Sequence, residues 1–296
     1  MIAQQLINGV VVGSVYALFA AGFTLIFSVQ RILNLAHGSV FMWGAFAGLY
    51  TARAGLPMPV SLLSGIAAGG LIGLALELLV FRPIRKRGEL EFAPIVGSIG
   101  ASLILISIAQ QVSATQIMRF PFESFPLITF QFLSVRLTLL QITIFFLSLL
   151  VSAGLYFYLY GTSFGRQIRA VAISQRTAGL LGINPNSIYL QTFFLAGALA
   201  GGAGVIIGLA FNSVHFLMGE PFMLRAIVIV VIGGLGSIGG AVFAGLALGV
   251  VETLVTISPY STLVDAVVYS FLFIILLLRP SGLFGDTSLV TGSSGK

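Results

Sequence analysis

Three arginines in one short segment are the residues of this sequence best suited to chemistry with a partner. Arg166, Arg169 and Arg176 lie between Tyr160 and Asn186, in a stretch that contains no acid. Guanidinium groups placed in this way suit pairing with carboxylates of another protein, and the alternative is contact with lipid phosphates. The segment therefore predicts a docking element and not a site of covalent catalysis.

Apolar residues recur one helical turn apart within this basic segment, which predicts a short amphipathic helix. The two groups with this spacing are Ile168, Val171 and Ala172, and Ala178, Leu181 and Gly182. A short basic helix between two membrane spans favours a lever that a partner pushes. The alternative is a solvated loop at the membrane surface.

The sequence has no constellation of catalytic or metal-ligating residues. It contains no cysteine and two histidines, and the patterns HExxH and GxSxG are absent. The terminal GSSGK at 292–296 lacks the GxxxxGK[ST] spacing and the flanking strand and helix of a phosphate-binding loop. We therefore expect no catalytic site, metal site or ATPase in this chain, so that any ATP and Mg would be bound by partner subunits.

Composition places the chain in a membrane. Of its 296 residues, 58% are hydrophobic and 7% are charged, whereas about a quarter of the residues of a soluble domain are charged. The apolar runs are continuous and do not alternate, which excludes a β-barrel and predicts an all-α polytopic membrane protein. The basic residues lie in loops between spans, where they set orientation beside membrane lipid and do not indicate nucleic-acid binding.

The apolar runs predict about eight transmembrane helices, each close to the roughly 20 residues that a bilayer requires. They lie near 6–29, 35–52, 60–81, 93–113, 137–160, 188–211, 226–256 and 263–279. The run at 226–256 is too long for one simple helix, so we expect a broken or re-entrant segment. The first span lacks a basic leader and is expected to be retained. Residues 1–285 then form one membrane domain with a loop at 161–187, and 286–296 form a flexible tail.

Basic residues also predict the orientation of the chain. Most of them lie between the third and fourth spans or between the fifth and sixth, so 82–92 and 161–187 are expected in the cytoplasm and the N-terminus outside. The outer loop 114–136 alternates and is aromatic, which predicts a short hairpin. Eight spans would put the C-terminus outside, on the same side as the N-terminus, which conflicts with the basic residue Arg279 beside the last apolar run. A re-entrant segment in 226–256 would change the number of crossings and so the side of the C-terminus.

Glycine clusters indicate close helix packing and one break. Most of the 36 glycines are explained by small residues that let helices approach closely in lipid. The tract Gly233–Gly240 differs, because six of its eight residues are Gly or Ser, too many for a helix interior. We predict an unwound junction there, of the kind that lines substrate pathways. The stretch 34–39 is a candidate for a matching break, and the similarity of 44–49 to 240–246 suggests a weak internal repeat.

Few polar side chains lie within the predicted spans, and each is a candidate for function or for structure. His37 either lines a pathway or caps a helix near the interface. Glu77 lies one turn from Arg82, which predicts an ion pair. Glu252 lies deep in an apolar run with no adjacent base, so it either contacts a substrate or accepts structural hydrogen bonds. Asp265 lies near a span end, where an interfacial role is expected.

Six motifs follow one another along nearly the whole chain. They are NGVVVGSVYALFAAGFTLIF (8–27), NLAHGSVFMWGAF (34–46), FRP (81–83), GRQIRAVAISQRTAGLLGIN (165–184), GGLGSIGGAVFAGLALGVVE (233–252) and RPSGLFG (279–285). In this order and spacing the sequence resembles the LivH-type permeases, the membrane subunits of branched-chain amino-acid ABC importers.

The resemblance implies a permease of the inner (plasma) membrane that works by alternating access. Its implied partners are a second homologous permease, two cytoplasmic ABC ATPases and a periplasmic or extracellular substrate-binding protein that docks on 114–136 and 212–224. Segment 165–184 corresponds to the coupling loop of the family, which docks on the ATPase. The expected coupling residues are Gly165, Arg166, Arg169, Ala170, Ala178, Gly182 and Ile183. The expected translocation pathway lies near Asn34, His37, Gly233, Gly236, Gly239 and Glu252.

Other functions stay open at this stage. Within the family, the substrate is a branched-chain or other neutral or hydrophobic amino acid, and related permeases carry urea or short amides. A secondary transporter driven by ions would use Glu252 and Asp265 as coupling groups, although the basic loop 161–187 argues against it. A passive channel would show flux independent of ATP and of a binding protein.

Overall fold

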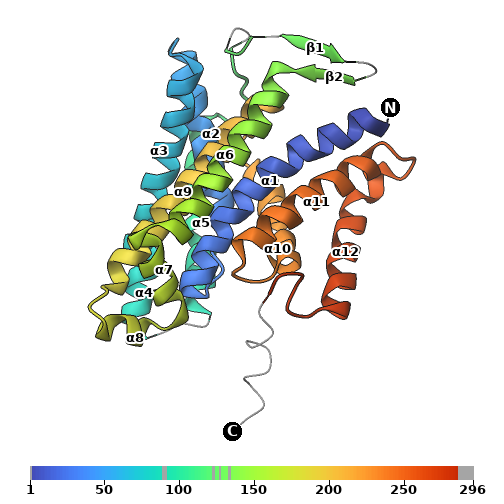
Figure 1. Cartoon of the computed structure of the whole chain (residues 1–296). Coiled ribbons are helices and arrows are strands. Elements are labelled where there is room, and N and C mark those ends of the chain that lie inside the picture. The colour runs from blue at the N-terminus through green and yellow to red at the C-terminus, as the bar shows by residue number, and fades with distance from the viewer. Residues whose placement is uncertain (1, 89–91, 122–123, 127, 133–134, 286–296) are drawn as a thin grey trace.

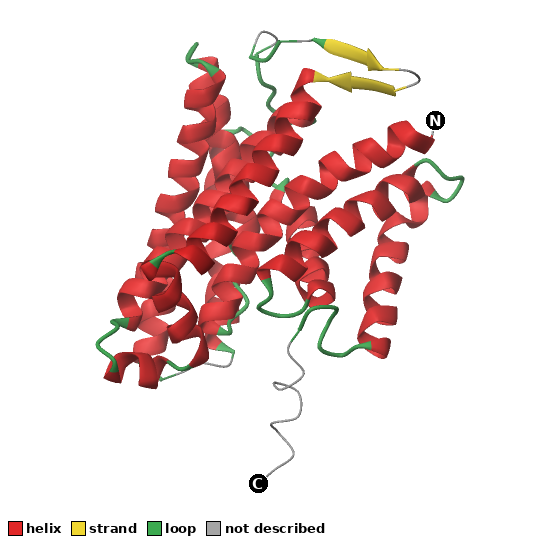
Figure 2. Ribbon diagram, in the orientation of Figure 1, coloured by secondary structure: helices red, strands yellow, loops and turns green. Residues whose placement is uncertain are grey.

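The computed structural model describes residues 2–88, 92–121, 124–126, 128–132 and 135–285, and the predicted tail 286–296 lies outside them. Helices make up most of this part of the chain (Figure 2). The helices and strands are α1 (Ile2–Gln30), α2 (His37–Arg53), α3 (Met58–Leu76), a π-helical turn η1 (Glu77–Phe81), α4 (Arg82–Lys86), α5 (Ala93–Val112), β1 (Thr129–Phe132), β2 (Val135–Thr138), α6 (Leu139–Gly161), α7 (Ser163–Ile173), α8 (Gln175–Leu180), α9 (Pro185–Ala210), α10 (Gly219–Gly233), α11 (Ile238–Thr256), a 3-10 turn η2 (Ser261–Leu263) and α12 (Val264–Leu278). The all-α membrane class is confirmed.

Seven helical segments of the described chain are long and apolar enough to cross a membrane, where about eight had been predicted. The difference lies in two short helices. α2 has 17 residues, and the predicted span at 226–256 consists of the end of α10, a turn and α11. With seven crossings, α12 ends at the same end of the molecule as α7 and α8 (Figure 1). This removes the conflict between the predicted parity and Arg279.

The predicted hairpin is confirmed and marks the end of the bundle opposite to α7 and α8 (Figure 1). β1 and β2 are antiparallel, with Phe130 opposite Leu137. The Gln4 side chain donates to the Arg136 carbonyl (2.8 Å) and accepts from the Arg136 N–H (2.7 Å), which fixes the start of α1 to the same end. We call the two ends of the bundle the hairpin end and the α7 end.

The two halves of the bundle repeat one arrangement in opposite directions. α1 runs from the hairpin end to the α7 end, and linker 31–36 returns the chain into the bundle, where α2 begins. α9 runs the opposite way, and linker 211–218 again returns the chain into the bundle, where α10 begins (Figure 1). Both turns contain a left-handed residue, Arg31 (φ 57°) and Asn212 (φ 46°). α3 and α5 follow in the first half, as α11 and α12 do in the second.

Glycine seams hold the two halves together, as small-residue packing in lipid predicts. α1 packs on α11 so closely that a Cβ on Gly249 would collide with the backbone of Gly13. α3 packs on α9 in the same way, and a Cβ on Gly197 would collide with the Gly69 carbonyl oxygen. α1 of the first half and α9 of the second therefore occupy equivalent places, and so do α3 and α11. The similarity of 44–49 to 240–246 was the wrong indicator of this repeat, because it relates α2 to α11.

Candidate functional site

Two half-length helices begin at one point inside the bundle. The first turn of α2 crosses the first turn of α10, where a Cβ on Gly38 would lie 2.7 Å from the Gly219 carbonyl oxygen. From this crossing α2 runs 17 residues toward the hairpin end and α10 runs 15 residues toward the α7 end. At 1.5 Å per residue these lengths are about 25 Å and 22 Å. The hydrocarbon core of a bilayer is about 30 Å thick, so the crossing lies deep within it.

The structure places Asn34 and His37 at the buried start of α2. The Asn34 Oδ1 accepts from the Ala36 N–H (3.1 Å), and the Asn34 carbonyl accepts from the His37 N–H (3.2 Å). The His37 ring is fully buried 4.8 Å from the Phe19 ring, measured between centroids. Among the residues that the structure describes, its two nitrogens have no hydrogen-bond partner. Asn34 thus orders the entry into α2, and a pathway role of either side chain stays a prediction.

The Gly233–Gly240 tract contains the predicted unwound junction, since α10 ends and α11 begins within it. The turn has φ 101° at Gly234 and φ 91° at Gly236, a conformation that glycine adopts without steric cost. The turn lies near the α7 end (Figure 1), where the Leu283 N–H donates to the Ile232 carbonyl (2.8 Å). The unwound junction is therefore confirmed, and it lies near the α7 end of the bundle. The midplane crossing is made by α2 and α10.

Glu252 belongs to a charged cluster with Arg225, a base that lies 27 residues away in the sequence. Arg225 Nε lies 3.0 Å from both carboxylate oxygens of Glu252, and Nη2 lies 2.6 Å from Oε1. The Tyr16 hydroxyl donates to Glu252 Oε2 (2.9 Å), and Arg225 Nη2 also donates to Asp265 Oδ1 (3.4 Å). The cluster ties α1, α10, α11 and α12 together, which favours the structural alternative for Glu252.

Glu77 pairs with Arg85 at 2.5 Å, and not with Arg82 as predicted. The π-helical turn η1 winds less per residue than an α-helix, and it brings residue 85 onto the face of residue 77. The Arg85 guanidinium also lies 4.2 Å from the centroid of the Tyr189 ring and donates to Gln30 Oε1 (3.4 Å). This second cluster joins α1, α4 and α9 near the α7 end.

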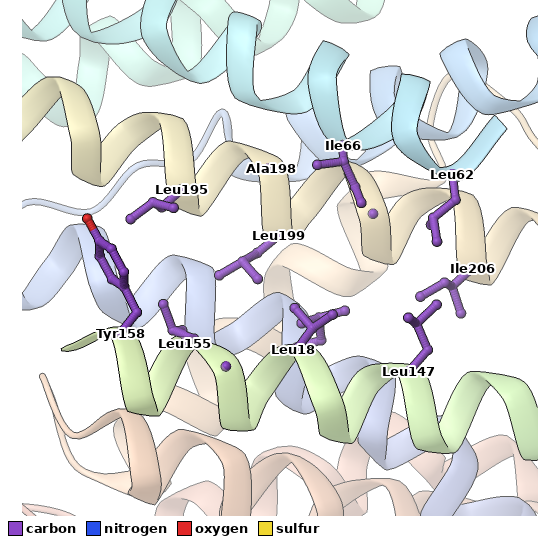
Figure 3. Close-up of a pocket in the computed structure, with 13 residues that line it drawn as sticks. Leu18, Leu62, Ile66, Leu147, Leu155, Tyr158, Leu195, Ala198, Leu199 and Ile206 are labelled. Carbon is purple, nitrogen blue, oxygen red and sulfur yellow. The ribbon is translucent and has the colours of Figure 1, made fainter. Parts of the chain in front are cut away.

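One cavity, of about 320 Å³, lies between α1, α3, α6 and α9. Leu18, Leu155 and Leu199 point into it (Figure 3), and Tyr158 is the only one of its 13 lining residues with a polar side chain. Ligand sites for polar solutes need a few placed polar groups within an apolar wall. This cavity suits a hydrocarbon chain and not a charged solute.

A second cavity, of about 260 Å³, lies where α2, α5 and α10 surround the crossing of the half-helices. Ser39, Ser102 and Glu220 give it a polar side, and the remaining wall is apolar apart from glycine backbone. Segment 212–224 was expected to be an outer docking loop. Residues 219–224 are not part of a loop, because they form the first turns of α10, and docking of a binding protein on this segment stays a prediction.

The predicted coupling segment is helical and is held firmly against α6. A Cβ on Gly165 would collide with the carbonyl oxygens of Tyr158 and Leu159. The Arg169 guanidinium donates to the Leu159 carbonyl and lies 4.8 Å from the centroid of the Tyr160 ring. Arg169 is thereby turned toward its own chain, so it anchors α7 rather than offering a free charge to a partner.

Some of the remaining predicted coupling residues are buried and hold the helix pair in place, and others are exposed. Ala178 is buried and Ala170 is half-buried, whereas Arg166 is exposed. Gly182 (φ 81°) ends α8, and the Ile183 N–H donates to the Ala178 carbonyl (3.0 Å). Gly165, Arg169 and Ala178 therefore hold the helix pair in place, and the surface offered to a partner consists of other side chains.

Large apolar side chains on α7, on α8 and just after α8 form that surface, and none of them is among the coupling residues predicted from the sequence. Ile173 is 88% exposed, Leu180 83% and Leu181 74%, and the arginine Arg176 is exposed beside them. The signal available in the sequence was the position of these apolar residues at the ends of two short basic helices. We call Ile173, Leu180 and Leu181, with Arg166 and Arg176, the α7–α8 surface.

Membrane-crossing helices, two half-helices that meet within the bilayer and a helix pair outside it define a membrane permease. Over residues 5–277 the chain matches the family described as "Branched-chain amino acid transport system / permease component", and it belongs to this family. The resemblance found in the sequence is thus confirmed. The chain is a multi-pass membrane protein and a transport component, not an enzyme.

Characterised relatives cover the chain almost completely. The branched-chain amino acid permease protein BraD of Pseudomonas aeruginosa is 33% identical over 294 residues, 95% of each chain. The corresponding LivH proteins of Salmonella typhimurium and Escherichia coli are 30% identical over 294 residues and 29% over 298, again over 95% of each chain. No solved structure matches the chain.

Proposed function

We propose that this chain is the membrane subunit of an ATP-driven ABC importer for branched-chain amino acids. The names of BraD and LivH support this substrate class. The partners in the proposal are a second homologous permease, two cytoplasmic ABC ATPases that bind ATP and Mg, and a periplasmic or extracellular binding protein. In this proposal the energy of ATP reaches the permease only through those ATPase subunits.

The observation that carries the proposal is the α7–α8 surface. Its three apolar side chains lie outside the membrane-crossing helices, in the same segment as the exposed Arg166 and Arg176. Fully burying a Leu or Ile side chain stabilises a complex by about 1.5–3 kcal/mol, and arginines beside such a patch favour a partner with an acidic rim. An ATPase groove with an apolar floor and acidic edges would bury this surface.

The attachment of α7 and α8 explains how an ATPase could move the pathway. α7 is clamped to α6 through Gly165 and Arg169, and only residues 181–184 separate α8 from α9. α9 packs on α1, where a Cβ on Gly22 would lie 3.0 Å from the Ala196 carbonyl oxygen. A displacement of α8 therefore reaches the two long helices that flank the crossing. Two arrangements of this bundle, favoured in turn by the ATPase states, would give alternating access.

Reconstitution tests the proposal. The permease is purified with its ATPase subunits and placed in liposomes, with ATP inside and the binding protein outside, and uptake of labelled leucine is measured. We expect uptake that requires both ATP and the binding protein, with valine and isoleucine competing better than urea. Uptake by the permease alone on an ion gradient would instead support a secondary transporter. Flux without either would support a channel.

A further inference from the structure

One acid at the crossing of the half-helices has no arginine partner. Glu77, Glu252 and Asp265 each lie within 4 Å of an arginine nitrogen. In the described part of the chain, the Glu220 carboxylate forms no salt bridge and no side-chain hydrogen bond. Glu220 follows Gly219 at the crossing of the half-helices, deep in the bilayer, and its side chain is exposed rather than packed inside the protein. A carboxylate at this depth is costly unless it faces water or a cation.

The cavity beside Glu220 supplies groups of the opposite kind on its α2 side. The backbone N–H groups of Gly38 and Ser39 have no acceptor among the residues that the structure describes, while the N–H groups on either side of them are bonded. The Ser39 hydroxyl also shares a 2.7 Å hydrogen bond with the Ser102 hydroxyl. Free N–H groups at a helix start attract negative charge.

The remaining wall of the cavity is apolar and includes Met42, Ile106 and Met223. The cavity therefore combines a carboxylate, a donor side and a hydrocarbon wall within about 260 Å³. This is several times the roughly 30 Å³ that one water molecule occupies in the liquid. The space suits one small amino acid and excludes a long peptide.

We propose that this cavity is the binding point of the substrate within the membrane. Glu220 binds the ammonium group of a small apolar amino acid, the first turn of α2 binds its carboxylate, and Met42, Ile106 and Met223 contact its side chain. The inference rests on the proposed function, because it assumes that the solute is an amino acid. It adds the residues that would select a zwitterion over a neutral amide such as urea, which carries no positive charge to compensate that of Glu220.

Charge removal at Glu220 tests the proposal in the reconstituted complex described above. Glu220→Gln keeps the shape of the side chain and should lower leucine uptake at least about tenfold, because a hydrogen bond to a charged group is lost. Glu220→Asp should retain more uptake than Glu220→Gln. Co-purification with the ATPases and ATP hydrolysis without leucine should stay as in the wild type. The matched control is Asp265→Asn, which removes a carboxylate away from the cavity and should transport normally.

A thiol at Ser102 gives a second readout that does not depend on transport. The chain has no cysteine, so Ser102→Cys introduces a single thiol into the cavity. A charged, water-soluble thiol reagent should label it, and leucine with the binding protein should slow labelling. Ser107→Cys lies on the same helix at an exposed position, faces lipid and should resist the reagent.

The outcomes separate this inference from the proposed function. Leucine uptake by the wild type together with normal uptake by Glu220→Gln would overturn the binding site and leave the importer standing. An unreactive Ser102→Cys, or a Glu220→Gln variant that no longer assembles with a second permease, would also overturn it. If the wild type imports no branched-chain amino acid, the proposed function fails, and leucine should then give Ser102→Cys no protection.

Discussion

Removing the charge of Glu252 should destabilise the permease, because it leaves Arg225 without its main partner. The side chains of Arg225 and Glu252 are 18% and 14% exposed, and Asp265, the other acid beside Arg225, is 72% exposed. Breaking a buried ion pair costs about 3–5 kcal/mol, and partial exposure places this pair at the lower end, about 3 kcal/mol. At roughly 2–3 °C per kcal/mol for a chain of this size, Glu252→Gln should melt about 6–9 °C lower.

The assay is thermal inactivation of the purified permease in detergent, followed as the fraction that stays monodisperse. The double variant Arg225→Leu with Glu252→Leu should lose less stability than the sum of its single variants, because no unpaired charge remains. Asp265→Asn should cost at most about 1 kcal/mol, as for other exposed pairs. Equal melting of Glu252→Gln and the wild type would refute this account. Normal melting with lost uptake would make Glu252 a substrate contact instead.

Three further predictions follow from close contacts and exposure. Gly236→Val should reduce stability and uptake, because φ is 91° there, whereas Gly239→Val should be nearly silent in the same two assays, because a Cβ would meet nothing within 4 Å. Leu180→Asp should leave the melting temperature unchanged and reduce co-purification of the ATPases several-fold, and retained ATPase binding would contradict the α7–α8 surface. Gly69→Leu should prevent folding by separating α3 from α9, measured as lost monodisperse protein, while Gly100→Leu on the open face of α5 should be tolerated.

The sequence was sufficient for features that depend on local composition and spacing. Continuous apolar runs identified the crossing helices, and alternation in 114–136 identified the hairpin. Glycine density identified the break at Gly233–Gly240 because so many glycines are incompatible with a helix interior. The basic segment was correctly predicted to be helical. Each of these signals lies within about 30 consecutive residues and requires no knowledge of the tertiary arrangement.

Features that depend on distant pairs could not be predicted in this way. Arg225 and Glu252 are 27 residues apart on different helices, so no local spacing indicates that they pair. Segment 212–224 contains Asn, Ser, His, Gly and Pro, a composition typical of a loop. This composition therefore did not predict that α10, which includes Glu220, begins within the segment. Arg169 is of a residue type that suits docking, but the packing of α7 on α6 turns its side chain toward its own chain.

The inverted arrangement explains why the crossing is the place where charge matters most. Glu77 follows the glycine seam of α3, Glu252 follows that of α11, and each is neutralised by an arginine. The ion pairs therefore stabilise both halves and leave the crossing free of a fixed counter-charge. There the equivalent positions after Gly38 and Gly219 differ, with Ser39 in one half and Glu220 in the other.

This single difference gives the crossing two chemically distinct sides. Two helix starts alone would both attract negative charge, and a zwitterion would have no reason to prefer one orientation. The Glu220 carboxylate makes one side attractive to an ammonium group, while the free N–H groups beside Ser39 keep the other side attractive to a carboxylate. A repeated fold thus acquires a polarised site through one side chain. For that reason Ser39→Glu combined with Glu220→Ser, which reverses the polarity and keeps the composition, should restore part of the leucine uptake that Glu220→Ser loses.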